Sequence, residues 1–124
     1  MNRIYEDADI YIEWEQSDIP WVKIFTHQPY KELTECPEAL RRKLFDIYTI
    51  VEKAMIDYFK PTKMNMASFG NYLPRVHIHV MARFEADSHF PEPMWGEKQR
   101  EGAMELPDFR LFEALLRERL KGLK

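Results

Sequence analysis

Residues 75–83 read Arg-Val-His-Ile-His-Val-Met-Ala-Arg, and this is the clearest alternation of polar and apolar residues in the chain. Side chains on a β-strand point alternately to its two faces. Arg75, His77 and His79 are therefore predicted to share one face, with successive Cα atoms about 6.5 Å apart. The apolar residues between them face a core. The pattern predicts a strand that presents two imidazoles and a guanidinium in one row, which suits an anion.

A hairpin is predicted to contain this strand. Residues 62–69 and 73–84 are expected to form its two arms, and Gly70-Asn71 between them is a competent turn. The Gly70 backbone amide and the Asn71 side-chain amide would then lie near His77, where they are able to bind an anion.

The rest of the chain predicts an α+β fold, in which an antiparallel sheet of about five strands carries one long central helix and a C-terminal helix. Earlier strands are expected at residues 3–6, 10–14 and 21–26. Pro37 and Pro61 bracket the long helix, of about six turns. Pro107 opens the second helix.

The long helix carries more apolar residues than one small sheet needs. Its main stripe steps by three and four residues, as an amphipathic helix does. Phe45, Tyr48, Met55 and Phe59 widen that stripe. A second apolar face indicates a second buried surface, so a partner on this helix is expected.

Length and composition limit the classes of protein to which this chain can belong. The 124 residues, 45% of them hydrophobic, predict one domain over residues 1–124 with a real core. A net charge of −3 disfavours a general nucleic-acid binder. Cys36 is the only cysteine, which excludes a disulfide framework and fits the cytoplasm. The sequence contains neither an apolar run of membrane-spanning length nor the apolar core of a signal peptide.

Two close histidines admit several kinds of chemistry. Imidazole is a good nucleophile that is partly neutral near pH 7, and attack at phosphorus also needs donors around the phosphate oxygens. A metal site would need a third ligand, for which Asp87 and His89 are the nearest candidates. Neither lies at a convincing spacing, so no metal or cofactor is expected. A plain hydrogen-bonded sheet surface also stays possible.

Residues 65–83, together with Ile-Tyr-Glu-Asp at 4–7, resemble the histidine triad superfamily of nucleotide hydrolases and transferases. The signature of that family is three histidines alternating with apolar residues on one strand. Residues 67–74, with Ala-Arg-Phe at 82–84 and Phe-Pro-Glu-Pro-Met-Trp-Gly at 90–96, look like a bacterial branch similar to diadenosine tetraphosphate hydrolases. The resemblance covers nearly the whole chain.

The resemblance implies an activity and roles for the central residues. His77 would attack the α-phosphate of a dinucleoside polyphosphate or a nucleoside phosphoramidate and carry a transient nucleotidyl group. His79 and Asn71 would contact the phosphate, and Arg75 would stand in the row as a further phosphate ligand. Asn65 would lie near the nucleotide.

The resemblance also implies a ribose-binding acid and a partner. The acid falls at Glu13 or Glu15. Family members are usually homodimers joined partly through the long helix, which agrees with the wide apolar face. Neither a nucleic acid nor a membrane is implied as a partner.

The chain departs from the family pattern at Arg75, which replaces the first histidine. An arginine stays charged, so it holds an anion but does not shuttle a proton. The alternative function is therefore a nucleotide-binding module in which catalysis is weakened or lost.

Overall fold

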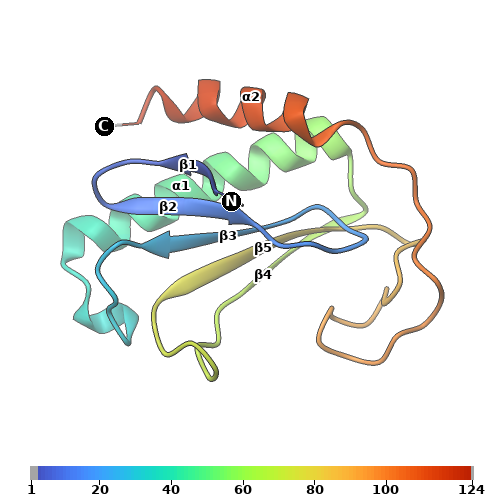
Figure 1. Ribbon diagram of the computed structural model, residues 1–124, viewed down its shortest axis with the longest axis horizontal. Coiled ribbons are helices and arrows are strands. Elements are labelled where there is room, and N and C mark those ends of the chain that lie inside the picture. Colours follow the sequence, from blue (N-terminus) through green and yellow to red (C-terminus); the bar gives the residue numbers. More distant parts are fainter. Residues whose placement is uncertain (1–2, 124) are drawn as a thin grey trace.

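The computed structural model describes residues 3–123. Figure 1 shows a single sheet with two helices on one side of it. The elements, in chain order, are β1 (Arg3–Glu6), β2 (Ile10–Trp14), β3 (Trp21–Thr26), the 3-10 turn η1 (Leu33–Glu35), α1 (Glu38–Phe59), β4 (Lys63–Ala67), β5 (His77–Arg83) and α2 (Phe109–Leu120).

The sheet has five strands in the order β1-β2-β3-β5-β4, and all neighbouring strands are antiparallel. The predicted α+β class is thereby confirmed. α1 begins directly after Pro37 and ends before Pro61, as predicted, with Lys60 in the left-handed conformation at its C-cap. Asp108 caps α2, because its side chain accepts a hydrogen bond from the Arg110 N–H.

The two faces of the sheet differ in character. One face is apolar and packs against α1 and α2, with completely buried residues such as Ile12, Ile24 and Val80 at its centre. The opposite face carries His77 and His79, which pair in register with Phe25 and Lys23 of β3. β5 lies between β3 and β4, so its histidines project from the interior of the sheet rather than from an edge.

α2 covers part of the wide apolar face of α1. Phe59 packs against Phe109 and Phe112 of α2, with ring centroids 5.5 and 5.1 Å apart. Met55 and Phe59 are buried, whereas Phe45 remains 52% exposed. Much of the second apolar surface is therefore buried within the chain, and Phe45 and Ile56 are the large apolar residues of α1 that stay exposed. No helix within residues 3–123 is long and apolar enough to cross a membrane.

The predicted hairpin is wrong in its boundaries. β4 ends at Ala67 and β5 begins at His77, so residues 68–76 form a longer connection in which Gly70 adopts a φ of 79°. Pro74 has no N–H for a ladder, and the Val76 N–H donates to the Tyr30 carbonyl oxygen instead of to β4. Arg75 consequently lies just before the strand, with its guanidinium 5.9 Å from the centre of the Phe25 ring.

Candidate active site

The two histidines of β5 line a cavity of about 450 Å³ that is open to solvent. Its residues come from the centre of the sheet, from the connection after β4 and from the long segment after β5. They are Lys23, Phe25, Phe69, Gly70, Asn71, Tyr72, Leu73, His77, His79 and Trp95.

His77 is held as a potential nucleophile. Its Nδ1 lies 2.8 Å from the carbonyl oxygen of Arg75. A carbonyl oxygen only accepts hydrogen bonds, so Nδ1 must carry a proton, and in the neutral ring Nε2 is the nitrogen with the free lone pair. The ring also stacks on Phe25, with centroids 5.2 Å apart and planes 16° apart. Backbone and aromatic contacts thus fix both the tautomer and the orientation of this imidazole.

His79 is held in the opposite tautomer. The indole Nε1 of Trp21 donates to His79 Nδ1 over 3.0 Å. Because an indole N–H only donates, Nδ1 must be unprotonated and Nε2 carries the hydrogen. Burial, with the nearby His77 and Lys23, lowers the pKa of His79 to about 4. His79 is therefore a neutral imidazole at pH 7 that offers one N–H.

The two imidazoles complement each other. Their ring centroids lie 5.0 Å apart, with one Nε2 acting as a lone-pair donor and the other as a hydrogen-bond donor. This pair can attack a phosphorus atom and hold one of its oxygens at the same time. Sequence reasoning missed Trp21, since nothing local shows which side chain contacts His79 from another strand.

Arg75 has partners other than the expected ones. Its Nη2 donates to the carbonyl oxygen of Thr26, the last residue of β3. The same Nη2 donates to the carbonyl oxygen of the next residue, His27, at 3.2 Å. Its Nε is buried without a hydrogen-bond partner among the described residues. The guanidinium thus joins the start of β5 to the end of β3, while the Arg75 carbonyl orients His77.

The two asparagines have different positions. Asn71 lines the histidine cavity together with Gly70, as expected from the sequence. Asn65 lies on β4 opposite Met81, and its Oδ1 accepts a hydrogen bond from Arg83 Nη1 at 2.9 Å. Asn65 thus binds Arg83 and is not among the residues that line the histidine cavity.

The two candidate ribose-binding acids flank Lys23. Glu15 forms an ion pair of 2.8 Å with Lys23, which lines the cavity. Glu13 lies directly opposite Lys23 in the antiparallel pairing of β2 and β3. Its carboxylate lies 3.8 Å from the guanidinium of Arg3. Both acids therefore lie on the β2 side of the histidines.

The segment at residues 85–105 contributes Trp95 to the lining of the cavity. A buried ion pair anchors the start of this segment, in which Arg83 Nε and Nη2 donate to the two carboxylate oxygens of Asp87 at 2.9 and 3.0 Å. Arg100 donates to the Asp87 carbonyl at 2.6 Å and to the Phe90 carbonyl at 2.8 Å. This framework places Trp95 beside His79, with ring centroids 4.9 Å apart.

The candidate metal ligands do not come together. Within residues 3–123, no three His, Cys, Asp or Glu side chains are grouped so that they could hold a metal ion. Asp87 is bound by Arg83, and His89 Nδ1 lies 2.7 Å from the hydroxyl of Ser88. The idea that either residue joins His77 and His79 as a ligand is therefore wrong.

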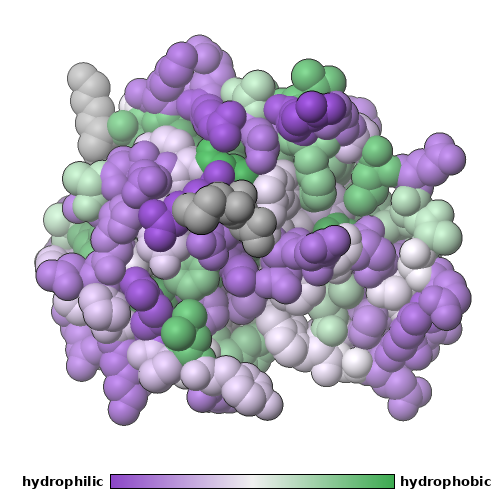
Figure 2. Space-filling model, viewed as in Figure 1, coloured by the Kyte–Doolittle hydropathy of each residue, from purple (hydrophilic) through white to green (hydrophobic). Residues whose placement is uncertain are grey.

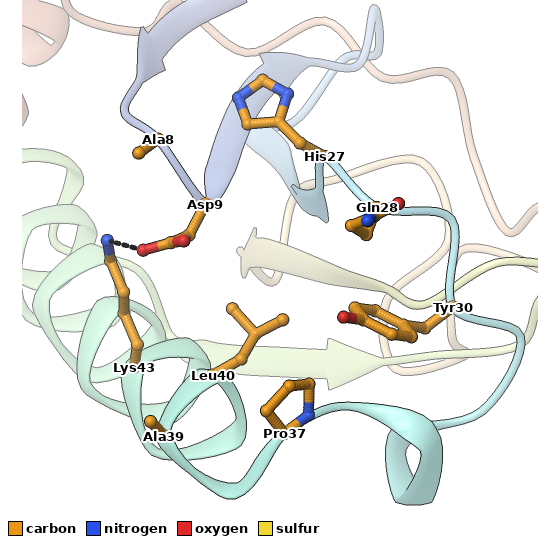
Figure 3. Close-up of a pocket in the computed structure, with 9 residues that line it drawn as sticks. All are labelled: Ala8, Asp9, His27, Gln28, Tyr30, Pro37, Ala39, Leu40 and Lys43. Carbon is orange, nitrogen blue, oxygen red and sulfur yellow. Dashed lines mark hydrogen bonds and ion pairs between the residues drawn. The ribbon is translucent and has the colours of Figure 1, made fainter.

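A second cavity, of about 400 Å³, lies between the β1–β2 turn, the segment after β3 and the start of α1 (Figure 3). Its cation, Lys43, is already paired with Asp7 at 3.0 Å and with Asp9 at 2.8 Å. His27 also lines it, with Nε2 only 2.9 Å from the Asp7 carbonyl. Its charges are neutralised within the chain, so it is the weaker candidate for an anionic ligand.

Comparison with known proteins identifies the family. The HIT domain matches residues 2–86. Histidine triad proteins from Bradyrhizobium japonicum and Marinobacter aquaeolei VT8 have similar structures, each with a TM-score of 0.78 and 24% identity. The first match covers 94% of this chain and 88% of that protein, and the second covers 98% and 90%.

A histidine triad protein from Sinorhizobium meliloti 1021 matches at 25% identity with a TM-score of 0.77, over 95% of this chain and 88% of that one. None of the curated proteins compared with this chain matches it. The family match extends over more than half of the sequence, from β1 to the end of β5. The chain therefore belongs to the HIT-domain family, whose members bind nucleotides or catalyse nucleotide hydrolysis or transfer.

Proposed function

We propose that this protein is a nucleotide hydrolase or transferase that acts at the α-phosphate of a dinucleoside polyphosphate through a nucleotidyl-histidine intermediate. The observation that carries the proposal is the pair of opposite tautomers at His77 and His79. One Nε2 is free to attack phosphorus, and the other donates a hydrogen bond to a phosphate oxygen.

The reaction proceeds in two displacements. The Nε2 lone pair of His77 forms a bond to the α-phosphorus, and the bond from phosphorus to the leaving oxygen breaks with its electron pair. The His77 ring becomes cationic. It keeps its Nδ1 proton, which stays hydrogen-bonded to the Arg75 carbonyl oxygen. Water then forms a bond to phosphorus, the P–N bond breaks, and the water's proton passes to solvent. The product is a nucleoside monophosphate, and His77 regains its lone pair.

Charge favours a polyphosphate over an amine as the leaving group. A departing polyphosphate needs no proton, whereas a departing amine does. His79, whose pKa is about 4, is a neutral donor at pH 7, and Arg75 does not release its proton. We therefore place the chain in the branch similar to diadenosine tetraphosphate hydrolases, with nucleoside phosphoramidates as slower substrates.

The test is the formation of AMP. Purified protein is mixed with diadenosine tetraphosphate and, separately, with adenosine phosphoramidate, and AMP is followed by chromatography. We expect AMP from both substrates, with the tetraphosphate cleaved faster. Absence of AMP from both would contradict the proposed reaction.

A nucleotide-binding module is the second candidate, and the placement of Arg75 favours it. The guanidinium is bound to backbone carbonyls and does not release a proton, so this position supplies no acid to a leaving group. On this reading, diadenosine tetraphosphate raises the melting temperature without being consumed. Thermal melts recorded before and after incubation with the nucleotide separate the two candidates.

We also propose a homodimer through α1 and the adjoining edge strand β4. Phe45 on α1 is exposed, and Met66 is 44% exposed on a strand that has a neighbour on one side only. Open strand edges and exposed apolar side chains are common sites of association. Light scattering at micromolar concentration should give the dimer mass, and a monomer would contradict this proposal. Cys36, a free thiol, supports a proposed location in the cytoplasm.

Trp21→Phe should impair His79 without unfolding the site. The variant keeps an aromatic ring but loses the N–H that fixes the tautomer of His79, so we expect kcat to fall roughly tenfold, the usual effect of one hydrogen bond. Nitrogen-15 shifts of the His79 ring should show the Nε2–H form in the original protein and a mixture in the variant. An Nδ1–H form in the original protein would contradict this assignment.

Arg75→Met should affect stability more than chemistry. The change leaves the carbonyl groups of Thr26 and His27 without this donor, so we expect a loss of roughly 1–3 kcal/mol in the free energy of unfolding. AMP formation should fall far less than in His77→Ala. Unchanged stability in urea, combined with complete loss of turnover, would instead place the Arg75 guanidinium at the phosphate.

A further inference from the structure

The histidine cavity has an aromatic wall on one side. Phe69 and Tyr72 from the connection after β4 are 57% and 104% exposed, and Trp95 from the segment after β5 is 48% exposed. All three line the same cavity as His77 and His79. Figure 2 shows one face of the protein as mostly hydrophilic, with scattered hydrophobic patches. Exposed apolar side chains that gather around a cavity commonly mark a binding surface.

The opposite side of the histidines is charged. Toward β2 and β1, Lys23 pairs with Glu15, and the guanidinium of Arg3 lies over the ring of Tyr11 at 3.8 Å. This side also carries a ring, because Phe25 of β3 stacks on His77 with centroids 5.2 Å apart. The aromatic wall comes from outside the strands, in the connection after β4 and the segment after β5, and adds exposed rings to the same cavity.

Trp95 is both fixed and accessible. Its ring makes edge contacts with Trp21, Phe69 and His79, with centroid distances of 5.2, 4.7 and 4.9 Å. The loop that carries it is anchored by the buried pair of Arg83 and Asp87. A ring that is already immobilised loses little freedom when a ligand stacks on it, which favours binding.

We propose that the aromatic wall of Phe69, Tyr72 and Trp95 binds an aromatic ring carried by the leaving group of the substrate. This inference rests on the proposed function, because it takes the attacked phosphorus to lie at His77. The ring is either the base of a second nucleoside or the aryl group of an amine. Stacking of a base on an aromatic side chain is tolerant of base identity, so discrimination among bases should be weak.

Binding to the His77→Ala protein tests the wall without turnover. Diadenosine tetraphosphate and the terminal methyl ester of adenosine 5′-tetraphosphate have the same phosphate charge, but only the first carries a second nucleoside, and calorimetry gives the Kd of each. We expect the dinucleotide to bind about tenfold more tightly, as stacking on one aromatic side chain allows. Adding Trp95→Leu should remove most of that advantage, and adding Tyr72→Leu should remove part of it. Leu111→Ala, on the exposed side of α2, should change neither Kd.

The outcomes separate the wall from the reaction. Equal affinity for the two nucleotides, together with no Trp95-dependent preference for an aromatic over a saturated amine in the second pair of ligands below, would overturn the wall even if AMP is released normally. An equal loss of affinity for both nucleotides in Trp95→Leu and none in Tyr72→Leu, again without a preference for the aromatic amine, would do the same. Loss of AMP release with the tenfold difference intact would overturn only the proposed reaction.

A second pair of ligands distinguishes the source of the ring. Adenosine phosphoramidates of benzylamine and cyclohexylmethylamine have similar size, but only the first is aromatic. A Trp95-dependent preference for the benzylamine compound, with no preference between the tetraphosphates, would assign the wall to aryl amines. A Trp95-dependent preference for the dinucleotide would assign it to a nucleobase.

Discussion

His77→Ala is expected to lower the rate of AMP formation from diadenosine tetraphosphate by at least about a thousandfold, because it removes the nucleophile itself. The change also removes the ring that stacks on Phe25 and the hydrogen bond to the Arg75 carbonyl, so we expect a modest fall in the melting temperature beside the loss of the nucleophile. The measurement is initial AMP release at saturating substrate.

His27→Ala is the matched control for this change. His27 is a half-buried histidine at the end of β3 that lines the second cavity and not the histidine cavity. Its removal should leave the rate within about twofold, as expected for a group outside the reacting centre. A comparable fall in both variants would mean that the loss reflects general destabilisation, and unchanged turnover in His77→Ala would remove the proposed nucleophile.

Asp87→Ala should cause the largest loss of stability. Arg83 and Asp87 are both almost completely buried, and the carboxylate accepts two hydrogen bonds from the guanidinium. Removing one partner leaves an uncompensated buried charge, so we expect a loss of roughly 3–5 kcal/mol in the free energy of unfolding. Urea unfolding measures it. The control Glu101→Ala breaks an exposed pair with Lys98 and should leave the free energy of unfolding nearly unchanged.

The same carboxylate predicts a loss of stability in acid. Burial alone would raise the pKa of Asp87, but hydrogen bonds from Arg83 and from the backbone N–H groups of Phe84, Phe90 and His89 hold it at about 2. The unfolded chain binds this proton first, near its ordinary pKa of about 3.9. The stabilisation is therefore complete above about pH 5 and is lost as the pH falls through 2. Asp87→Ala should lack this part of the acid transition, and an identical pH profile would contradict the assignment.

Local patterns predicted the elements that depend on local forces. The alternation at residues 77–83 and the stepped apolar residues between Pro37 and Pro61 correspond to β5 and α1. The hairpin failed where a distant partner competes. The Val76 N–H donates to the Tyr30 carbonyl, so β5 begins only at His77 and Arg75 lies before the strand. No turn propensity at Gly70-Asn71 shows that contact.

The site was predicted in part for the same reason. His77, His79 and Asn71 line one cavity because strand alternation in β5 and the connection that precedes it bring them together. The groups that fix the tautomers come from elsewhere, an indole on β3 and a backbone carbonyl before β5. The irregular segment at residues 85–105 is ordered around the buried carboxylate of Asp87. This carboxylate accepts hydrogen bonds from backbone N–H groups as well as from Arg83. Such a framework leaves no periodic signal in a sequence.

The most direct test of the central claim is to find the covalent intermediate. The protein is mixed with diadenosine tetraphosphate, quenched within the first turnover and analysed by intact mass and by mass spectrometry of its peptides. The expected result is an adenylyl group on the peptide that contains His77, with no adduct in His77→Ala. AMP release without any adduct in the original protein, at an undiminished rate in His77→Ala, would contradict nucleophilic catalysis by this histidine.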